Sequence, residues 1–271
     1  MRFALVDSGL GVLPAAMHLR RLYPGAALVL SMDPEGMPWG PRSPDDIAER
    51  ALACAQATLP WQPDVLVLAC NTASVRALDV LRAELEPSVP VVGTVPAIKP
   101  AAAGGGAVAI WATAATTGSP YQQELIRKFA DGVLVTEVAC PGLADAIESA
   151  DMDATTDAIA AAAALTPAAA KAVVLGCTQY ELAMDRIRSV MPKVRLHGSA
   201  PAVAAQAIRR TTTRPTPRAD TPAEDSPAGG DPGAPDVHVL LSGAPGELPA
   251  AALRYAEGRL LAGLRLRSTL A

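Results

Sequence analysis

The chain has 271 residues, half of them hydrophobic, and a net charge of −4, so it can bury the core of one large or two small domains. Its pI near 5.4, with lysine and arginine scattered along the sequence, argues against a nucleic-acid-binding protein. The four cysteines never occur in CxxC spacing and the three histidines are not clustered, so we expect neither a disulfide framework nor a metal site. Small-molecule chemistry in a reducing compartment is the favoured class.

The amino terminus runs directly into an apolar strand that ends in Asp7, which is unlike a secretory signal. The longest candidate for a membrane span, residues 158–176, is interrupted by Thr166, Pro167 and Lys171 and falls short of the roughly 20 apolar residues that a span needs. We interpret this stretch as helix, turn and strand. A cytoplasmic protein without membrane contact is expected.

Short runs rich in β-branched residues alternate with alanine-rich helical patterns along most of the chain. This alternation is typical of α/β proteins. In chain order, the predicted strands are 3–6, 27–32, 64–69, 89–93, 107–112, 133–138, 171–175 and 237–241.

One predicted helix has a clear start. Ser43 can cap it and Pro44 suits its first turn, after which Ile47, Ala51 and Cys54 fall on one face. We therefore expect Cys54 to be a core residue rather than a catalytic one.

Residues 211–236 have no apolar period and are rich in Pro, Thr, Gly and Ala. Such a segment buries too little surface to offset the entropy of ordering, so a disordered insert is predicted. The fold is expected to resume with a strand from Val237 and a helix from Pro249 to Leu264.

Cys70 and Cys177 end two similar apolar runs, and each is followed at once by small hydrogen-bonding residues. In open α/β sheets, ligands bind beyond the carboxyl ends of such strands. A thiol beside backbone amides at a strand-to-helix turn gains thiolate character, and Asn71 and Thr72 can bind a carboxylate. Taken alone, Cys70 is explained as well by a buried structural role. A second cysteine, Cys177, at an equivalent strand end favours a functional role for both thiols.

Asp7 ends the first predicted strand and is followed by Ser8 and Gly9. Its carboxylate could orient or deprotonate a group at the site, or it could cap a helix or a turn, and the residues leave both open. Gly9 and Gly11 are a weak match to a dinucleotide loop, because the third glycine is absent.

Two thiols without a cofactor suit a particular reaction. A base on one face of an amino acid's α-carbon removes a proton, and an acid on the other face returns one, so the stereocentre inverts. A thiol is only a few per cent ionised at neutral pH, so one side can hold thiolate while the other holds thiol. The pattern predicts a two-base racemase.

Further motifs occur in a fixed order along the chain, namely Asp7-Ser8-Gly9, Asp33, Pro38-Trp39-Gly40, Cys70-Asn71-Thr72-Ala73-Ser74, 93–100, Ala112-Thr113 with Thr116, Cys140-Pro141 with Glu148, and Gly176-Cys177-Thr178. In this order they resemble the motifs of the cofactor-independent, two-cysteine glutamate racemases of the aspartate/glutamate racemase superfamily. The similarity extends from residue 3 to about 210 and resumes at 237.

The resemblance implies an α/β fold with two Rossmann-like parallel-sheet lobes, related by a pseudo-twofold axis, and an active site between them. Residues 1–95 plus 200–271 would form the first lobe and 96–199 the second. It also implies interconversion of L- and D-glutamate without a cofactor, which supplies D-glutamate for peptidoglycan. The expected binding partner is then a small molecule, the acidic amino acid that serves as substrate. The resemblance does not decide whether the protein forms a homodimer.

The resemblance also implies residue roles. Cys70 would abstract the proton of D-glutamate and Cys177 that of L-glutamate, with Asp7 assisting Cys70 and Glu148 on the Cys177 side. The residues expected to bind the substrate are Ser8, Pro38, Trp39, Gly40, Asn71, Thr72, Thr116, Thr178 and Gln179.

The chain departs from the family pattern at two of these positions. Gln179 stands where the family usually has histidine and cannot shuttle a proton, and Trp39 replaces the usual tyrosine. His197 could replace the missing base, whereas His18 and His238 are expected to be structural. The alternatives are a racemase of aspartate or another acidic amino acid, or an impaired family member that acts as a binding or regulatory protein.

Overall fold

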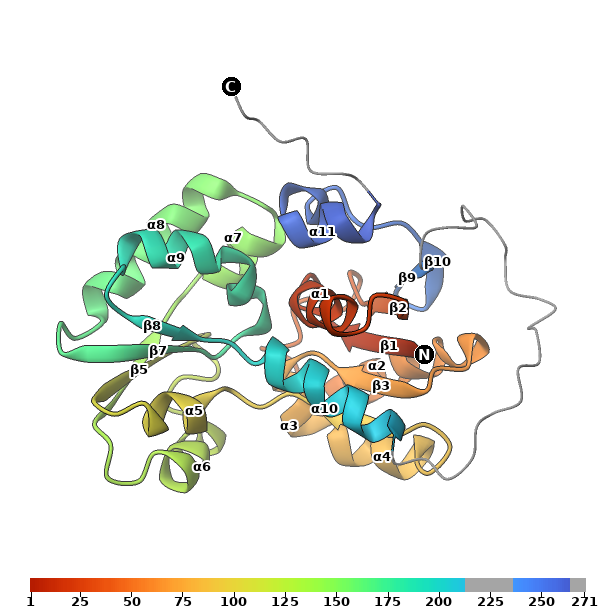
Figure 1. Cartoon of the computed structure of the whole chain (residues 1–271), viewed down its shortest axis with the longest axis horizontal. Coiled ribbons are helices and arrows are strands. Elements are labelled where there is room, and N and C mark those ends of the chain that lie inside the picture. The colour runs from red at the N-terminus through yellow and green to blue at the C-terminus, as the bar shows by residue number, and fades with distance from the viewer. Residues whose placement is uncertain (213–235, 264–271) are drawn as a thin grey trace.

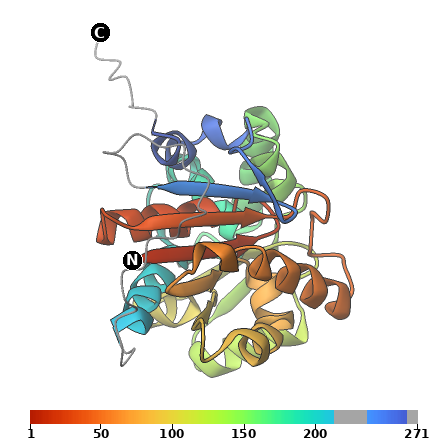
Figure 2. The ribbon, with the colours of Figure 1, turned by 90° about the vertical axis from the view of Figure 1, so that its right-hand side faces the viewer.

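Two mainly parallel β-sheets organise the computed structural model, which describes residues 1–212 and 236–263 (Figure 1). The strands of the larger sheet are β1 (Arg2–Asp7), β2 (Ala27–Met32), β3 (Val65–Leu68), β4 (Val91–Gly93), β9 (Val237–Leu241) and β10 (Ala244–Gly246). Their order is β10-β9-β2-β1-β3-β4, and only β10 runs antiparallel to its neighbour. Figure 2 shows blue β9 beside the red strands, so the chain returns to this sheet after the predicted insert.

The smaller sheet repeats this arrangement. Its strands are β5 (Ala107–Ala112), β6 (Val135–Ala139), β7 (Ala170–Leu175) and β8 (Arg195–His197). Their order, β6-β5-β7-β8, matches β2-β1-β3-β4 strand for strand. We call the larger sheet with its helices the first lobe and the smaller sheet with its helices the second lobe. The predicted division into 1–95 plus 200–271 and 96–199 stays a proposal, which the membership of the strands supports.

Helices cover both faces of each sheet. In the first lobe they are α1 (Val12–Leu22), α2 (Pro44–Gln56), η1 (Leu59–Trp61), α3 (Asn71–Arg76), α4 (Leu78–Leu85), α10 (Ala200–Thr212), η3 (Ala252–Arg254) and α11 (Ala256–Leu261). In the second lobe they are α5 (Ile98–Ala103), α6 (Pro120–Phe129), α7 (Leu143–Glu148), α8 (Met152–Leu165), η2 (Thr178–Ala183) and α9 (Met184–Val190).

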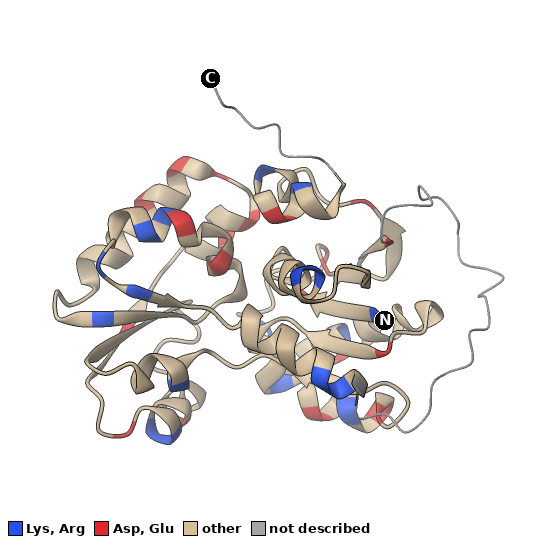
Figure 3. Cartoon of the chain, in the orientation of Figure 1, with Lys and Arg blue, Asp and Glu red and all other residues tan. Residues whose placement is uncertain are grey.

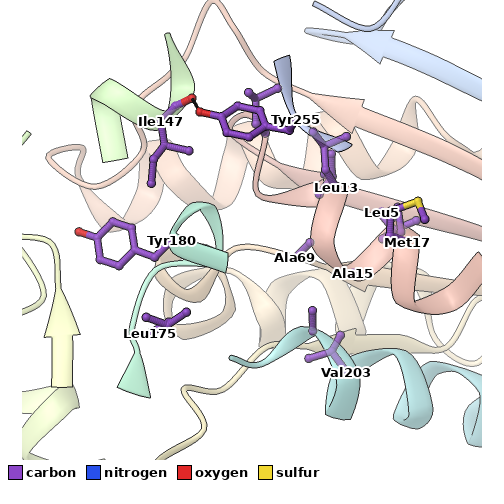
Figure 4. Close-up of a cluster of buried hydrophobic side chains, with 14 of the residues drawn as sticks. Leu5, Leu13, Ala15, Met17, Ala69, Ile147, Leu175, Tyr180, Val203 and Tyr255 are labelled. Atoms are coloured by element: carbon purple, nitrogen blue, oxygen red, sulfur yellow. Dashed lines mark hydrogen bonds between the residues drawn. The ribbon is translucent and has the colours of Figure 1, made fainter. Parts of the chain in front are cut away.

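The strands of the first lobe are mainly apolar on both sides because helices bury both faces of the sheet. Successive side chains of a strand point to opposite faces, so Phe3 and Leu5 join one buried cluster while Ala4 and Val6 join another. The first of these clusters continues into the second lobe, where it includes Tyr180. Figure 4 shows part of this shared core. The two lobes therefore bury apolar surface against each other.

The predicted α/β alternation is confirmed, and every predicted strand overlaps an observed one. The predicted start of α2 is also confirmed, because the Ser43 hydroxyl accepts a hydrogen bond from the Asp46 backbone N–H at 3.2 Å. Cys54 lies in the core at 3% exposure, and burial raises the pKa of its thiol to about 12. Within the described residues, no helix has the length and apolar character that crossing a membrane requires.

Two expectations near the carboxyl terminus need correction. The predicted helix from Pro249 to Leu264, whose last residue lies outside the described residues, is two short pieces, η3 and α11. Tyr255 between them has an extended backbone and is buried, which separates the two pieces. Residues 211 and 212, the first two of the predicted insert, are helical, since α10 continues through Thr212. The rest of that prediction, residues 213–235, lies outside the described residues.

Candidate active site

A cavity of about 330 Å³ is lined by both lobes. Its walls come from the segments between six strands, three from each sheet, and the helices that follow them, as expected for an open α/β sheet. The lining residues are Ser8, 38–41, 70–72, 113–116, 140–142, 144–145 and 176–179. One site therefore collects segments that are separated by more than a hundred residues of sequence.

The two predicted thiols face this cavity from equivalent positions. Cys70 follows β3 and precedes α3, and Cys177 follows β7 and precedes η2, each with an extended backbone. Burial raises the pKa of the Cys70 thiol well above its usual value and that of Cys177 to about 12, against the opposing effect of nearby backbone N–H groups. Burial therefore favours the neutral form of both thiols, and a thiolate needs a neighbouring cation or proton acceptor.

Asp7 lies behind the first thiol and is fully buried. Its carboxylate accepts hydrogen bonds from the Gly9 backbone and the Ser8 hydroxyl, both at 3.2 Å, and from the Thr178 hydroxyl of the other lobe at 3.1 Å. It caps no helix, because α1 begins after Gly11 without a side-chain cap. Burial raises the pKa of Asp7 to about 7, helped by the charge of Glu148. Asp7 can therefore gain or lose a proton near neutral pH.

Glu148 ends α7 and lies on the side of the second thiol. Both of its carboxylate oxygens accept a hydrogen bond from the Leu10 backbone N–H, at 3.1 and 2.9 Å. Burial is the main cause that raises its pKa. Glu148 does not line the cavity, so any action on a ligand must pass through a neighbour.

That neighbour is Gln179. The Cys177 thiol donates a hydrogen bond to the Gln179 side-chain oxygen at 2.7 Å, and the Gln179 amide nitrogen donates to Glu148 at 3.4 Å. The Gln179 amide therefore links the Cys177 thiol to the Glu148 carboxylate. Because the amide oxygen accepts a hydrogen bond from the S–H group, this contact favours the neutral thiol over the thiolate.

Gly9 and Gly11, which resembled part of a dinucleotide-binding loop, lie against the buried carboxylates. A Cβ at Gly9 would lie 2.4 Å from a Glu148 carboxylate oxygen, and one at Gly11 would lie 2.2 Å from an Asp7 carboxylate oxygen. Both glycines make room for the buried carboxylates beside the thiols.

The remaining predicted substrate residues all line the cavity, namely Ser8, Pro38, Trp39, Gly40, Asn71, Thr72, Thr116 and Thr178. Some are held in place by other contacts. Asn71 donates to the Gly176 carbonyl of the other lobe at 2.9 Å, and the Trp39 indole donates to Asp33 at 2.9 Å. Trp39 thus anchors its loop, and Asn71 helps to join the lobes.

Three further residues with polar or thiol side chains line the cavity without a role predicted from the sequence. Thr113 and Cys140 belong to the ordered motifs, whereas Asp145 was missed. Asp145 lies three residues before Glu148 in α7, so helical spacing from the predicted Glu148 could have indicated it. His197 does not line the cavity and is not brought to Cys177 as a replacement base. His238 packs against Trp61, with ring centroids 5.6 Å apart.

Gln179 provides a testable prediction. Gln179→His should raise the L-to-D turnover number more than the D-to-L one, because imidazole can accept the Cys177 proton that an amide cannot. The equilibrium constant between enantiomers is unity, so the Michaelis constants must change in compensation. Rates in both directions across pH measure this. Gln206→His, on the exposed side of α10, is the matched control. Superimposable profiles for wild type and Gln179→His would contradict the prediction.

The architecture defines a class of protein: two α/β lobes of equal strand order that present one thiol each to a shared cavity. Residues 15–207 match the Asp/Glu/hydantoin racemase family. A glutamate racemase of Roseiflexus sp. (strain RS-1) is 39% identical over 206 residues, which cover 74% of this chain and 75% of that protein. A glutamate racemase of Ectopseudomonas mendocina (strain ymp) is 35% identical over 209 residues, which cover 75% of this chain and 79% of that protein.

A solved structure agrees with these sequence matches. Escherichia coli glutamate racemase in complex with L-glutamate matches with a TM-score of 0.72 at 31% identity, over 78% of this chain and 82% of that one. The chain therefore belongs to the Asp/Glu/hydantoin racemase family. The resemblance inferred from the ordered motifs, and the two-lobed α/β fold that it implied, are confirmed.

Proposed function

We propose that the protein interconverts L- and D-glutamate by a two-base mechanism in which Cys70 and Cys177 are the catalytic residues. The observation that carries the proposal is the pair of thiols at equivalent strand ends of one cavity. The named relatives, all glutamate racemases, and the L-glutamate bound to the Escherichia coli protein support the choice of substrate.

The proton balance of each turnover is simple. The Cys70 thiolate takes the α-proton of D-glutamate and the Cys177 thiol donates its proton to the opposite face, which leaves L-glutamate, a neutral Cys70 and a Cys177 thiolate. The reverse direction exchanges these roles. Asp7, with its pKa of about 7, accepts the thiol proton on the first side, and the substrate's ammonium group stabilises the thiolate. On the second side the Gln179 amide positions Cys177 between the substrate and Glu148.

An acidic substrate would be held in the cavity by neutral polar groups, because the cations lie only in an adjoining hollow. The cavity is lined by no lysine, arginine or histidine, so its hydroxyl, amide and backbone N–H groups would hold the carboxylates. An adjoining hollow of about 90 Å³ shares Asn71, Thr72 and Thr116 with the cavity and adds Arg42 and Arg76. Arg42 is paired with Asp46 at 2.7 Å. Arg76 makes no ion pair within the described residues, so its charge is available to attract an anion.

We expect Arg76→Gln to raise the Michaelis constant for glutamate about threefold at low salt, since an exposed charge within a Debye length of the mouth is worth well under 2 kcal/mol. The turnover number should stay unchanged, because Arg76 does not line the cavity of the thiols. Steady-state kinetics at low and high ionic strength measure both constants. Arg82→Gln on α4 makes the same charge change as a control. Equal Michaelis constants for both variants and wild type would remove Arg76 from substrate capture.

The experiment that tests the proposed function is exchange of the α-proton in deuterated water. A glutamate racemase incorporates solvent deuterium into each enantiomer as it interconverts them. Stronger exchange with aspartate would favour the alternative acidic substrate, and an unchanged α-proton in both would favour a binding or regulatory protein.

The proposed setting is the cytoplasm, where four free cysteines stay reduced, and the proposed role is to supply D-glutamate for peptidoglycan. Assembly into a homodimer stays a prediction, and light scattering of the purified protein tests it.

A further inference from the structure

Asp33 belongs to the ordered motifs of the sequence but has no part in the proposed mechanism. It follows β2 directly and is 3% exposed. It does not line the cavity of the thiols, whereas Pro38, Trp39 and Gly40, a few residues further along, do. A buried carboxylate is costly unless it is hydrogen-bonded, so the partners of Asp33 indicate what it holds.

Four donors converge on this carboxylate. One oxygen accepts hydrogen bonds from the Gly36 backbone N–H at 3.1 Å and from the Ser242 hydroxyl at 2.9 Å. The other accepts from the Trp39 indole at 2.9 Å and from the Arg50 guanidinium at 3.2 Å. Burial alone would raise the pKa of Asp33, but the hydrogen bonds from the indole, the Ser242 hydroxyl and the guanidinium outweigh it and lower the pKa. The carboxylate is therefore charged at neutral pH.

Trp39 is the donor that lines the cavity. It is 1% exposed, and Asp33 is the acceptor of its indole N–H. The next residue, Gly40, borders open space, because a Cβ added there would meet no atom within 4 Å. The Gly40 backbone N–H makes no hydrogen bond within the described residues, so it is free to bind a substrate carboxylate. The cavity side gives this loop no support, and the bond to Asp33 supplies it.

Ser242 brings the carboxyl-terminal strand pair into this arrangement. It lies between β9 and β10, beyond residues 15–207 that match the racemase family. Its hydroxyl also accepts a hydrogen bond from the Glu35 backbone N–H at 3.2 Å, and its own N–H donates to the Met32 carbonyl at 2.7 Å. The turn after β9 is therefore bound to the segment from which the cavity loop starts.

Arg50 of α2 approaches from the opposite side. It also pairs with Asp46 at 3.0 Å, and Asp46 pairs with Arg42 at 2.7 Å. Arg42 donates in turn to the Gly36 carbonyl. Ion pairs at partly exposed positions contribute little, so the buried hydrogen bonds to Asp33 are the contacts that fix the loop.

We propose that Asp33 is a positioning residue for racemisation, which holds the Trp39 indole and so keeps the 38–41 wall of the cavity in place for the substrate's carboxylate. Ser242 orients the Asp33 carboxylate, so the carboxyl-terminal strand pair takes part in substrate binding although it lies outside the cavity. Both residues act through Trp39 and neither touches the substrate. The effect on kinetics rests on the proposed function, whereas the anchoring of the indole does not.

Asp33→Asn should raise the Michaelis constant for glutamate about tenfold, the lower end of what a hydrogen bond to a charged group contributes. Ser242→Ala should raise it less, because the indole keeps its acceptor. The turnover number should change less than the Michaelis constant in both variants, since the thiols follow other strands. The equilibrium constant between enantiomers is unity, so the Michaelis constants of L- and D-glutamate should rise by the same factor. Steady-state kinetics in both directions measure this.

Trp39→Phe keeps an aromatic ring but removes the indole N–H, so it tests whether Asp33 acts through Trp39. The double variant Asp33→Asn/Trp39→Phe should have the Michaelis constant of the more impaired single variant rather than the product of the two effects. Trp39 is one of three tryptophans, and the difference between spectra with and without it gives its fluorescence in the absence of substrate. We expect Asp33→Asn and Ser242→Ala to shift this emission, because the acceptor of the indole is lost or turned.

Glu86→Gln is the matched control, because it neutralises another hydrogen-bonded carboxylate of the first lobe. Glu86 accepts from the Val91 backbone N–H at 3.0 Å and pairs with Arg210 at 2.6 Å, in the region where Figure 3 shows charged residues of both signs on α10 and α4. Val91 begins β4, whereas the cavity lies beyond the carboxyl ends of the strands. Glu86→Gln should therefore leave the Michaelis constant unchanged.

A Michaelis constant of Asp33→Asn equal to that of wild type or of Glu86→Gln would overturn the proposal. A turnover number that falls as much as the Michaelis constant rises would do the same, as would multiplied effects in the double variant. If Asp33→Asn does not fold, Ser242→Ala at its half-buried turn carries the same measurements. If wild type does not racemise glutamate, the proposed function fails, and an unshifted Trp39 emission in both variants then overturns the anchoring.

Discussion

Cys70→Ala and Cys177→Ala should each abolish the interconversion of glutamate enantiomers. We expect the turnover number to fall by about 10⁴-fold or more, the upper end of what one positioned acid–base group contributes. Each direction needs a base on one face and an acid on the other, so removing either thiol stops both. The surviving thiol can still remove a proton from the enantiomer that faces it. We therefore expect residual α-proton exchange from one enantiomer only. Chiral chromatography measures racemisation, and proton NMR in deuterated water measures exchange.

Cys140→Ala is the matched control for this pair. Cys140 lines the same cavity, is 3% exposed and has a thiol pKa raised by burial to about 12. Its thiol donates a hydrogen bond to the Val138 backbone carbonyl at 3.6 Å and not to a side chain that binds a carboxylate. Its loss should leave most of the turnover number in place. Near wild-type racemisation by Cys70→Ala, or a loss in Cys140→Ala as large as in the other two, would contradict the assignment of the two bases.

Asp7→Asn should lower turnover about 10²–10⁴-fold, the usual contribution of a positioned acid–base group, and should at the same time stabilise the fold at alkaline pH. The pKa of Asp7 is raised from 3.8 to about 7 in the folded state, so the native protein holds a proton that the unfolded chain has lost. This contribution to stability is fully present below the unfolded pKa and is lost as pH rises through about 7. An asparagine stays neutral and keeps an acceptor oxygen for the Gly9 backbone.

The melting temperature of Asp7→Asn relative to wild type should therefore increase from about pH 5 to about pH 8, with a free-energy difference of a few kcal/mol as the upper bound. Thermal unfolding followed by circular dichroism at several pH values measures it. Asp79→Asn, on the exposed surface of α4, should show no such trend. A turnover number equal to wild type would make Asp7 a purely structural residue, and a pH-independent difference in melting temperature would contradict its raised pKa.

The sequence by itself determined every strand of the described residues except the three-residue β8 and β10, the two strand ends that carry Cys70 and Cys177, and the start of α2. These are local properties: β-branched runs, capping residues and small polar residues after a strand keep their meaning wherever the strand is placed. Because the carboxyl ends of parallel strands share one edge of the sheet, the positions of Ser8, Asn71 and Thr178 at the cavity, with Asp7 buried beside it, also followed from the pattern.

Only the tertiary structure decided which of these groups touch. Thr178 reaches Asp7 from 171 residues away, and Leu10 binds Glu148 from 138 residues away. No local pattern encodes such pairs, because they depend on how two sheets with a shared core are packed. The same packing breaks the carboxyl-terminal helix at Tyr255, which lies extended so that its hydroxyl meets Ile147. It also brings Cys70 and Cys177 to one cavity, since a cavity between lobes exists only once both lobes have folded against each other.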